Sequence, residues 1–164
     1  MPIFAFPTSH CLAAADQPLP NFHTVEPGIY RGGAPTVDGL SKLKAMGVKT
    51  IIDLRIAPKT VKKEGQEARA MGFNWINLPM GSDAPTTKEV DTLLATLKTA
   101  SPQNPVYVHC QHGADRTGCM LGVWRVTHDH WTYDRALAEM RKYGFQTRWV
   151  NLSNTVRRYA SSPN

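Results

Sequence analysis

Apolar positions along the chain follow two spacings, one typical of buried strands and the other of amphipathic helices. Short runs of β-branched and other apolar residues predict strands over residues 48–54, 73–79 and 105–110. Apolar residues that recur every three or four positions predict helices over residues 36–47, 58–72, 86–100, 117–129, 132–144 and 149–160. Because strands alternate with helices, we expect an α/β domain with a mostly parallel central sheet flanked by helices.

Local signals at the ends of the predicted elements agree with this pattern. Thr36 is a suitable N-cap and Gly47 a suitable C-terminal stop for the first helix. Thr86 and Glu89 have the spacing of a capping box at the start of the third. Proline and glycine turn signals within residues 22–35 predict a short hairpin or an irregular edge ahead of the sheet.

Three loops leave the carboxyl ends of the predicted strands. They comprise residues 55–63, 80–85 and 110–116. In a parallel sheet the carboxyl ends of the strands share one edge, and ligands bind in the crevice beyond it. We therefore expect the three loops to form one rim that carries the functional site.

Composition narrows the class of protein and of partner. The 164 residues suit one domain, and the net charge of +6 favours an anionic partner such as nucleic acid, an acidic surface or a phosphorylated small molecule. Three cysteines do not make a disulfide framework. No apolar stretch reaches the roughly 18 residues of a membrane span. We expect one functional domain over residues 22–160, acting as a monomer, after an N-terminal segment of residues 1–21.

The N-terminal segment resembles the end of a secretory signal. A short apolar run leads to three alanines, residues 13–15, ahead of Asp16, although a basic region is missing and Pro7 interrupts the run. The segment therefore favours a periplasmic or secreted location. The alternative is a disordered lead-in on a cytoplasmic protein.

The loop after the third strand combines a thiol, a run of backbone amides and a guanidinium. Cys110 ends the strand and Arg116 opens the next helix. The residues between them, whose amides can form an anion-binding nest, are Gln111, His112, Gly113, Ala114 and Asp115. A helix N-terminus lowers the pKa of a nearby cysteine, and an arginine fork binds two phosphate oxygens. A nucleophile beside an oxyanion cradle is the arrangement that phosphoryl transfer through a covalent intermediate requires.

This segment resembles the signature of the cysteine-dependent phosphatases. The matching residues are His109, Cys110, Gly113, Arg116 and Thr117, in the pattern Cys-x5-Arg-Thr/Ser. The stretches "IYRGGAPT" and "TIIDLR" are similar to segments of small bacterial and fungal members. Over about residues 22–160 the chain thus resembles the protein tyrosine and dual-specificity phosphatase superfamily, and a phosphatase-type fold is implied.

The resemblance implies a role for each of four catalytic residues. Cys110 is the nucleophile and Arg116 holds the phosphate, while Thr117 hydrogen-bonds the sulfur. Asp83, on the loop upstream, is the expected general acid, with a solvated turn aspartate as the alternative. His109 is expected to orient the loop. This chemistry needs no metal and no cofactor.

Cations near the signature bear on the substrate. His112, Arg55 and Lys59 are expected to line the rim, and a pocket ringed by cations suits a ligand with several phosphates. The resemblance therefore leans toward the phosphatase-like phytases, which act on inositol polyphosphates. A phosphatase acting on phosphotyrosine or other phosphoproteins is the alternative. Asp115 either orients Arg116, shares in proton transfer or stabilises the loop.

Several residues and rival functions stay open. Gln146, Arg148 and Arg31 are weaker candidates for the rim, and Cys119 is either a core residue or a resolving thiol for oxidised Cys110. A zinc site at the histidines and cysteines lacks paired ligand spacing. A sulfurtransferase of the rhodanese type has a shorter loop, and a non-catalytic phosphate-binding module would have lost part of the signature. Nucleic-acid binding rests on net charge alone.

Overall fold

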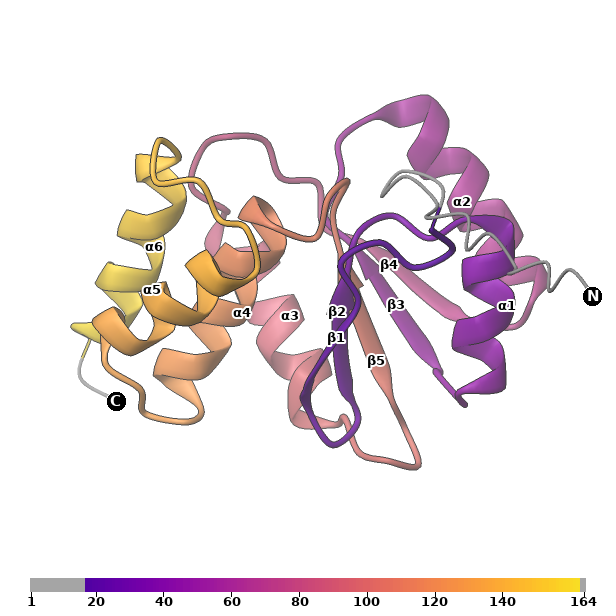
Figure 1. The fold of residues 1–164 in the computed structure, drawn as a ribbon, viewed down its shortest axis with the longest axis horizontal. Coiled ribbons are helices and arrows are strands. Elements are labelled where there is room, and N and C mark those ends of the chain that lie inside the picture. The colour runs from indigo at the N-terminus through magenta and orange to yellow at the C-terminus, as the bar shows by residue number, and fades with distance from the viewer. Residues whose placement is uncertain (1–16, 163–164) are drawn as a thin grey trace, which may run out of the picture.

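The computed structural model describes residues 17–162, and its strands and helices form one layered unit (Figure 1). The strands are β1 (His23–Glu26), β2 (Ile29–Gly32), β3 (Thr50–Asp53), β4 (Asn74–Asn77) and β5 (Val106–His109). The helices are α1 (Val37–Ala45), α2 (Pro58–Ala70), α3 (Thr87–Lys98), α4 (Asp115–Thr127), α5 (Tyr133–Lys142) and α6 (Val150–Ala160). Among the described residues no helix is long and apolar enough to cross a membrane.

The five strands form one sheet in the order β1-β2-β5-β3-β4. β2, β5, β3 and β4 run parallel, whereas β1 pairs with β2 in the opposite direction. The expected α/β class with a mostly parallel sheet is therefore confirmed. The segment predicted as a hairpin supplies β1 and β2, and it also places β2 directly beside β5, the strand that leads into Cys110.

Helices cover both faces of the sheet: α1 and α2 lie on one side and α3 to α6 on the other (Figure 1). Side chains of the central strands alternate between the two layers, as a period of two requires. Ile51 of β3 and Tyr107 of β5 pack in the cluster with α1 and α2. Ile52 and Val108 pack in the larger cluster with α3 to α6. The sheet is thus buried on both faces, which explains its unbroken apolar runs.

The helix α4 lies at the centre of the larger layer. Residues 117–126 of α4 are all buried, so this helix is enclosed by the protein on every side. It packs against α5 and α6, where a Cβ on Gly122 would crowd Val156 and Met140. This packing fixes the start of α4, and with it Arg116, against the end of β5.

Two sequence-derived details concern the ends of elements. The hydroxyl of Thr86 accepts a hydrogen bond from the backbone amide of Glu89. The carboxylate of Glu89 in turn accepts one from the backbone amide of Thr86, so the capping box at α3 is confirmed. Residues 17–21, which precede the boundary expected at residue 22, also pack onto the domain. The carbonyls of Pro18 and Pro20 accept hydrogen bonds from the backbone amides of Thr36 and Gly33. The signal-like residues 1–16 lie outside the described part of the chain.

Candidate active site

The loop from β5 to α4 is held against the end of β2. The backbone amide of Ala34 donates to the carbonyl of Gln111 over 3.1 Å. Gly113 has a φ of +70°, and a Cβ on it would overlap the backbone of Gly32. Glycine is therefore required at position 113, because two backbones meet there, whereas a Cβ on Gly32 would overlap the hydroxyl of Tyr107. The segment "YRGG" thus forms the platform on which the signature loop rests.

Cys110 lies at the floor of this loop with 2% of its surface exposed. Burial alone raises the pKa of its thiol, but hydrogen bonds from Thr117, the charge of Arg116 and the backbone amide of His112 outweigh burial and lower the pKa below the ordinary cysteine value. The hydroxyl of Thr117 is buried and has no other hydrogen-bond partner, so it is available to the sulfur. A thiolate is therefore favoured where the loop amides converge.

Arg116 opens α4 and reaches toward the loop after β4. Its Nη1 donates to the carbonyl of Met80 over 3.3 Å. The two following residues, Gly81 and Ser82, line the same cavity as the guanidinium. Arg116 thus links two of the three loops that the sequence places at one rim.

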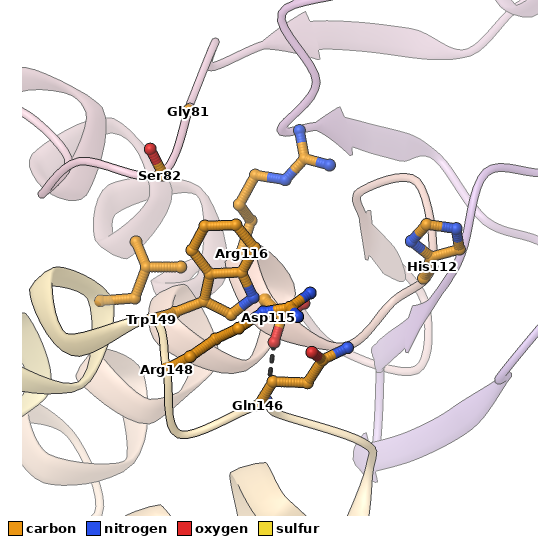
Figure 2. A pocket seen from close by; sticks show the side chains of 9 residues that line it. Gly81, Ser82, His112, Asp115, Arg116, Gln146, Arg148 and Trp149 are labelled. Carbon is orange, nitrogen blue, oxygen red and sulfur yellow. Dashed lines mark hydrogen bonds between the residues drawn. The ribbon is translucent and has the colours of Figure 1, made fainter.

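A cavity of about 340 Å³ opens above the signature loop (Figure 2). Its lining residues are Gly81, Ser82, His112, Asp115, Arg116, Gln146, Arg148, Trp149 and Leu152. In this view Gly81 and Ser82 lie on one side, His112 lies on the other, and Gln146, Arg148 and Trp149 lie between them. Two guanidinium groups and one imidazole thus face a cavity that contains a single carboxylate.

Asp115 connects the signature loop to the segment between α5 and α6. Its Oδ1 accepts a hydrogen bond of 2.8 Å from the backbone amide of Gln146 (Figure 2). Of the three roles considered for Asp115, this contact favours stabilisation of the loop. It also brings Gln146 and Arg148, both weak candidates from the sequence, to the wall of the cavity.

Asp83 lies on the exposed loop between β4 and α3, next to the cavity but not in its lining. Its Oδ1 accepts a hydrogen bond of 3.5 Å from Nδ2 of Asn151 in α6. The loop is therefore tethered at Met80 by Arg116 and at Asp83 by Asn151. This position beside Ser82 is compatible with the role of a general acid, which stays a prediction.

Arg55 does not lie on the rim, in contrast to the expectation from sequence. It is 5% exposed, and its guanidinium is paired with the carboxylates of Asp53 and Glu64. The reason is charge: β3 carries a buried carboxylate two residues earlier and α2 presents a second one, so the arginine turns inward to neutralise both. Lys59 is exposed at the start of α2 and does not line the cavity.

His109 completes this buried ionic cluster from β5. Its Nε2 lies 2.8 Å from Glu64 and its Nδ1 lies 3.1 Å from the carbonyl of Cys110. Burial lowers the pKa of the imidazole, but the charge and the hydrogen bond of Glu64 outweigh burial and raise the pKa. When it is doubly protonated, His109 can donate to both partners, which agrees with the expected role of orienting the loop.

The same cluster bears on metal binding. Within residues 17–162, donor atoms of Asp53, Glu64 and His109 form the one group close enough together to hold an ion. The guanidinium of Arg55 already binds both carboxylates there. The zinc ligands considered from the sequence do not form such a group in the described part of the chain.

Cys119 lies inside α4 and is fully buried in the larger core cluster. Burial raises the pKa of its thiol to about 12. A protonated, inaccessible thiol reacts poorly with an oxidised partner, so the structure favours the core role for Cys119 over the role of a resolving thiol. Cys11 lies outside the described residues.

Four residues of the cavity were not named as candidates from the sequence: Gly81, Ser82, Trp149 and Leu152. Trp149 precedes α6 and looks like an ordinary core residue by spacing. Its indole Nε1 is buried and has no hydrogen-bond partner, and the guanidinium of Arg148 lies 5.1 Å from its ring. The only available signal was its position directly after the candidates Gln146 and Arg148.

Comparisons with known proteins agree with the geometry. The family described as "DSP-PTPase phosphatase fused to NAD+ Kinase" matches residues 15–158. The dual specificity protein phosphatase TpbA of Pseudomonas aeruginosa strain UCBPP-PA14 is 29% identical over 142 residues, which are 86% of this chain and 62% of TpbA. The inositol diphosphatase DSP3 of Arabidopsis thaliana is 33% identical over 130 residues, 76% of this chain and 63% of DSP3.

Solved structures give the same picture of the fold. The crystal structure of P. aeruginosa TpbA has a TM-score of 0.71 at 26% identity, with 84% of each chain covered. The core catalytic domain of the S. cerevisiae PP-IP phosphatase SIW14, in complex with citrate, has a TM-score of 0.74 at 21% identity over 87% of each chain. The chain spans about three fifths of the length of the curated relatives named above.

Proposed function

The chain belongs to the DSP-PTPase phosphatase family found fused to NAD+ kinase, and from this premise we propose that it hydrolyses phosphate esters of inositol polyphosphates through a phosphocysteine intermediate. One observation carries the proposal. A cysteine with a lowered pKa begins a loop of backbone amides, and His112, Asp115 and Arg116 of that loop line a cavity together with Arg148.

In the first step, the thiolate of Cys110 attacks phosphorus and the bond to the leaving oxygen breaks. Arg116 and the loop amides bind the equatorial phosphate oxygens, where negative charge develops. Asp83 gives its proton to the leaving oxygen, so that an alcohol departs rather than an alkoxide.

In the second step, water attacks phosphorus and the sulfur–phosphorus bond breaks. Asp83, now a carboxylate, takes the proton of the water. The hydroxyl of Thr117 donates to the departing thiolate of Cys110 and lowers the energy of its release. Inorganic phosphate leaves, and the starting protonation state is restored.

Substrate choice follows from the charges around the cavity. Arg148 and His112 line the same cavity as Arg116 and can bind further phosphates of the same ligand. The relative DSP3 is named an inositol diphosphatase and the structural neighbour SIW14 a PP-IP phosphatase. These names support a ligand with several phosphates.

Phosphotyrosine is the second candidate substrate, and Trp149 is the observation that favours it. An indole in the wall of the cavity can pack against a phenyl ring. TpbA, moreover, has been crystallised in complex with phosphotyrosine.

Phosphate release from purified protein tests the proposal directly. Inositol hexakisphosphate, a diphosphoinositol polyphosphate and a phosphotyrosine peptide are compared at matched concentrations, with the Cys110→Ser variant as blank. A clearly higher kcat/KM on inositol hexakisphosphate than on the peptide supports the proposal. A preference for the diphosphoinositol compound would keep the ligand class and place the cleaved bond in a phosphoanhydride instead of an ester. A preference for the peptide would indicate that phosphoproteins are the substrates. If none of the three compounds released phosphate, the phosphatase assignment would be overturned.

Arg148→Ala is expected to raise KM for the inositol polyphosphate about tenfold and to leave kcat nearly unchanged. A change of about tenfold in affinity is what the loss of one exposed charge-assisted hydrogen bond produces. The small substrate p-nitrophenyl phosphate carries no second phosphate, so its KM stays within about twofold on the same principle. Arg141→Ala is the matched control, because Arg141 is an exposed arginine of α5 outside the cavity lining. Equal effects of the two substitutions would show that only net charge matters.

Asp83→Asn is expected to lower kcat about a hundredfold on alkyl phosphates, because their leaving oxygen needs a proton. p-Nitrophenolate leaves without one, so hydrolysis of p-nitrophenyl phosphate should be much less affected. Initial rates are measured on both substrates between pH 4 and pH 8, in steps of about one unit. This range begins near the usual pKa of a carboxyl group and extends well above it. Asp115→Asn is the comparison, since Asp115 is the carboxylate of the cavity lining. A leaving-group dependence that appears in Asp115→Asn instead would assign the proton transfer to Asp115.

A further inference from the structure

Arg31 of β2 lies behind the signature loop rather than on the rim. It is 1% exposed, and its Nη2 donates to the carbonyl of Gly113 over 2.9 Å. Its guanidinium lies 4.4 Å from the centre of the Tyr143 ring, and its Nε is buried without a hydrogen-bond partner. The side chain is therefore fixed between the loop and the segment that follows α5.

The charge of Arg31 has no adjacent carboxylate among residues 17–162. The two other buried arginines in that range are paired: Arg55 with Asp53 and Glu64, and Arg125 with Glu26, Asp129 and Glu139. Burial lowers the pKa of Arg31 to about 10, so the guanidinium stays charged at neutral pH. A buried cation without a paired anion is costly, and its retention calls for an anion nearby.

The groups that act on Arg31 at longer range identify that anion. They are Glu139 of α5, Tyr143, Cys110, Arg125 of α4, His23 of β1 and Tyr107 of β5, whose pKa is raised by burial. The carboxylate of Glu139 is already bound by Arg125 through two hydrogen bonds. This leaves the thiolate of Cys110, and the phosphate that binds above it, as the negative charge that Arg31 can balance.

We propose that Arg31 is a positioning residue that holds the signature loop from behind and adds a second fixed positive charge beneath the nucleophile and the bound phosphate. Because a trans peptide places its carbonyl and its N–H on opposite sides, a carbonyl of Gly113 that faces Arg31 turns the amide of Ala114 away from it, toward the interior of the loop. The part of this inference that concerns phosphate rests on the proposed function. The part that concerns the thiol does not.

Alkylation of Cys110 by iodoacetamide tests the electrostatic part without any substrate. The rate is measured against pH for the wild type, Arg31→Met and Arg31→Lys, with mass spectrometry of the Cys110 peptide. Arg31→Met removes the charge. Because Thr117, Arg116 and the amide of His112 act more strongly on the thiol than Arg31 does, we expect alkylation about twofold to threefold slower near pH 6, equivalent to a rise of about 0.3 to 0.5 in the thiol pKa. Arg31→Lys keeps the charge, so its alkylation profile should stay near that of the wild type. Its kcat/KM should nevertheless fall, because lysine cannot hold the carbonyl and the Tyr143 ring together.

Arg125→Met is the matched control, since it removes another buried arginine, 8% exposed, at the far end of α4. It should lower Tm and leave the alkylation profile unchanged. If Arg31→Met lowers Tm but leaves that profile unmoved, Arg31 is only structural and the proposal is wrong. If Arg31→Met does not fold, Tyr143→Leu replaces it, with a smaller shift expected in the same direction and no shift counting against the proposal. A wild type that alkylates as expected but releases no phosphate would defeat the proposed function alone.

Discussion

Cys110→Ser is expected to lower kcat at least about ten-thousandfold on every substrate, as removal of a covalent nucleophile does. The hydrogen bonds and charges around Cys110 lower the pKa of a thiol, but they leave the far weaker acid serine protonated near neutral pH. The variant should still bind substrate, because Arg116 and the loop amides remain. Single-turnover phosphate release and a binding titration separate the two effects.

Cys119→Ala is the matched control for this substitution. Cys119 lies nine residues further on, is fully buried and has a raised pKa. Its replacement should cost some stability through a small cavity and leave kcat near the wild-type value. Substantial turnover by Cys110→Ser would exclude a phosphocysteine intermediate.

The lowered pKa of Cys110 also sets a direction for pH dependence. A group whose pKa is lowered stays ionised in more acidic solution, so activity that depends on the thiolate persists below the usual cysteine range. The acidic limb of kcat/KM should coincide with the pKa from iodoacetamide alkylation of Cys110. If the pKa from kcat/KM differs from the pKa from alkylation, a group other than Cys110 sets the acidic limb.

The fold was predictable from the sequence because its signals are local. Buried strands appear as continuous apolar runs, and capping residues mark the helix starts, as Thr86 and Glu89 do for α3. The position of β2 beside β5 was not predictable, since β1 and β2 are four residues each and the sequence predicts only a short hairpin or an irregular edge there. Pairing between distant segments is set by packing, and periodicity does not encode it.

The candidate site was predictable where one contiguous loop supplies it. Cys110, Arg116 and Thr117 come together because a strand, a loop and a helix follow one another in sequence. Arg55 was misplaced, because a strand-end arginine looks the same whether it faces solvent or two buried carboxylates. Trp149 was missed for a related reason. An aromatic residue at a helix start has the same position in the apolar pattern whether it packs in the core or lines a cavity.

Arg116→Lys is expected to lower kcat/KM about a hundredfold to a thousandfold, the usual effect of losing one preorganised donor to a developing oxyanion. Lysine keeps the charge but not the planar fork that holds two phosphate oxygens at once. It also loses the second nitrogen that lets Arg116 bind phosphate while it holds the carbonyl of Met80.

The Arg116→Lys effect should fall on kcat more than on KM, because the fork binds the transition state better than the substrate. Steady-state kinetics on p-nitrophenyl phosphate provide the measurement, with Arg135→Lys on the exposed face of α5 as the matched control. A loss confined to KM would mean that Arg116 only attracts the substrate. An unchanged kcat/KM would mean that phosphate is held elsewhere. The expected loss in kcat, with Arg135→Lys near the wild type, ties catalysis to the guanidinium geometry, because both variants keep the same total charge.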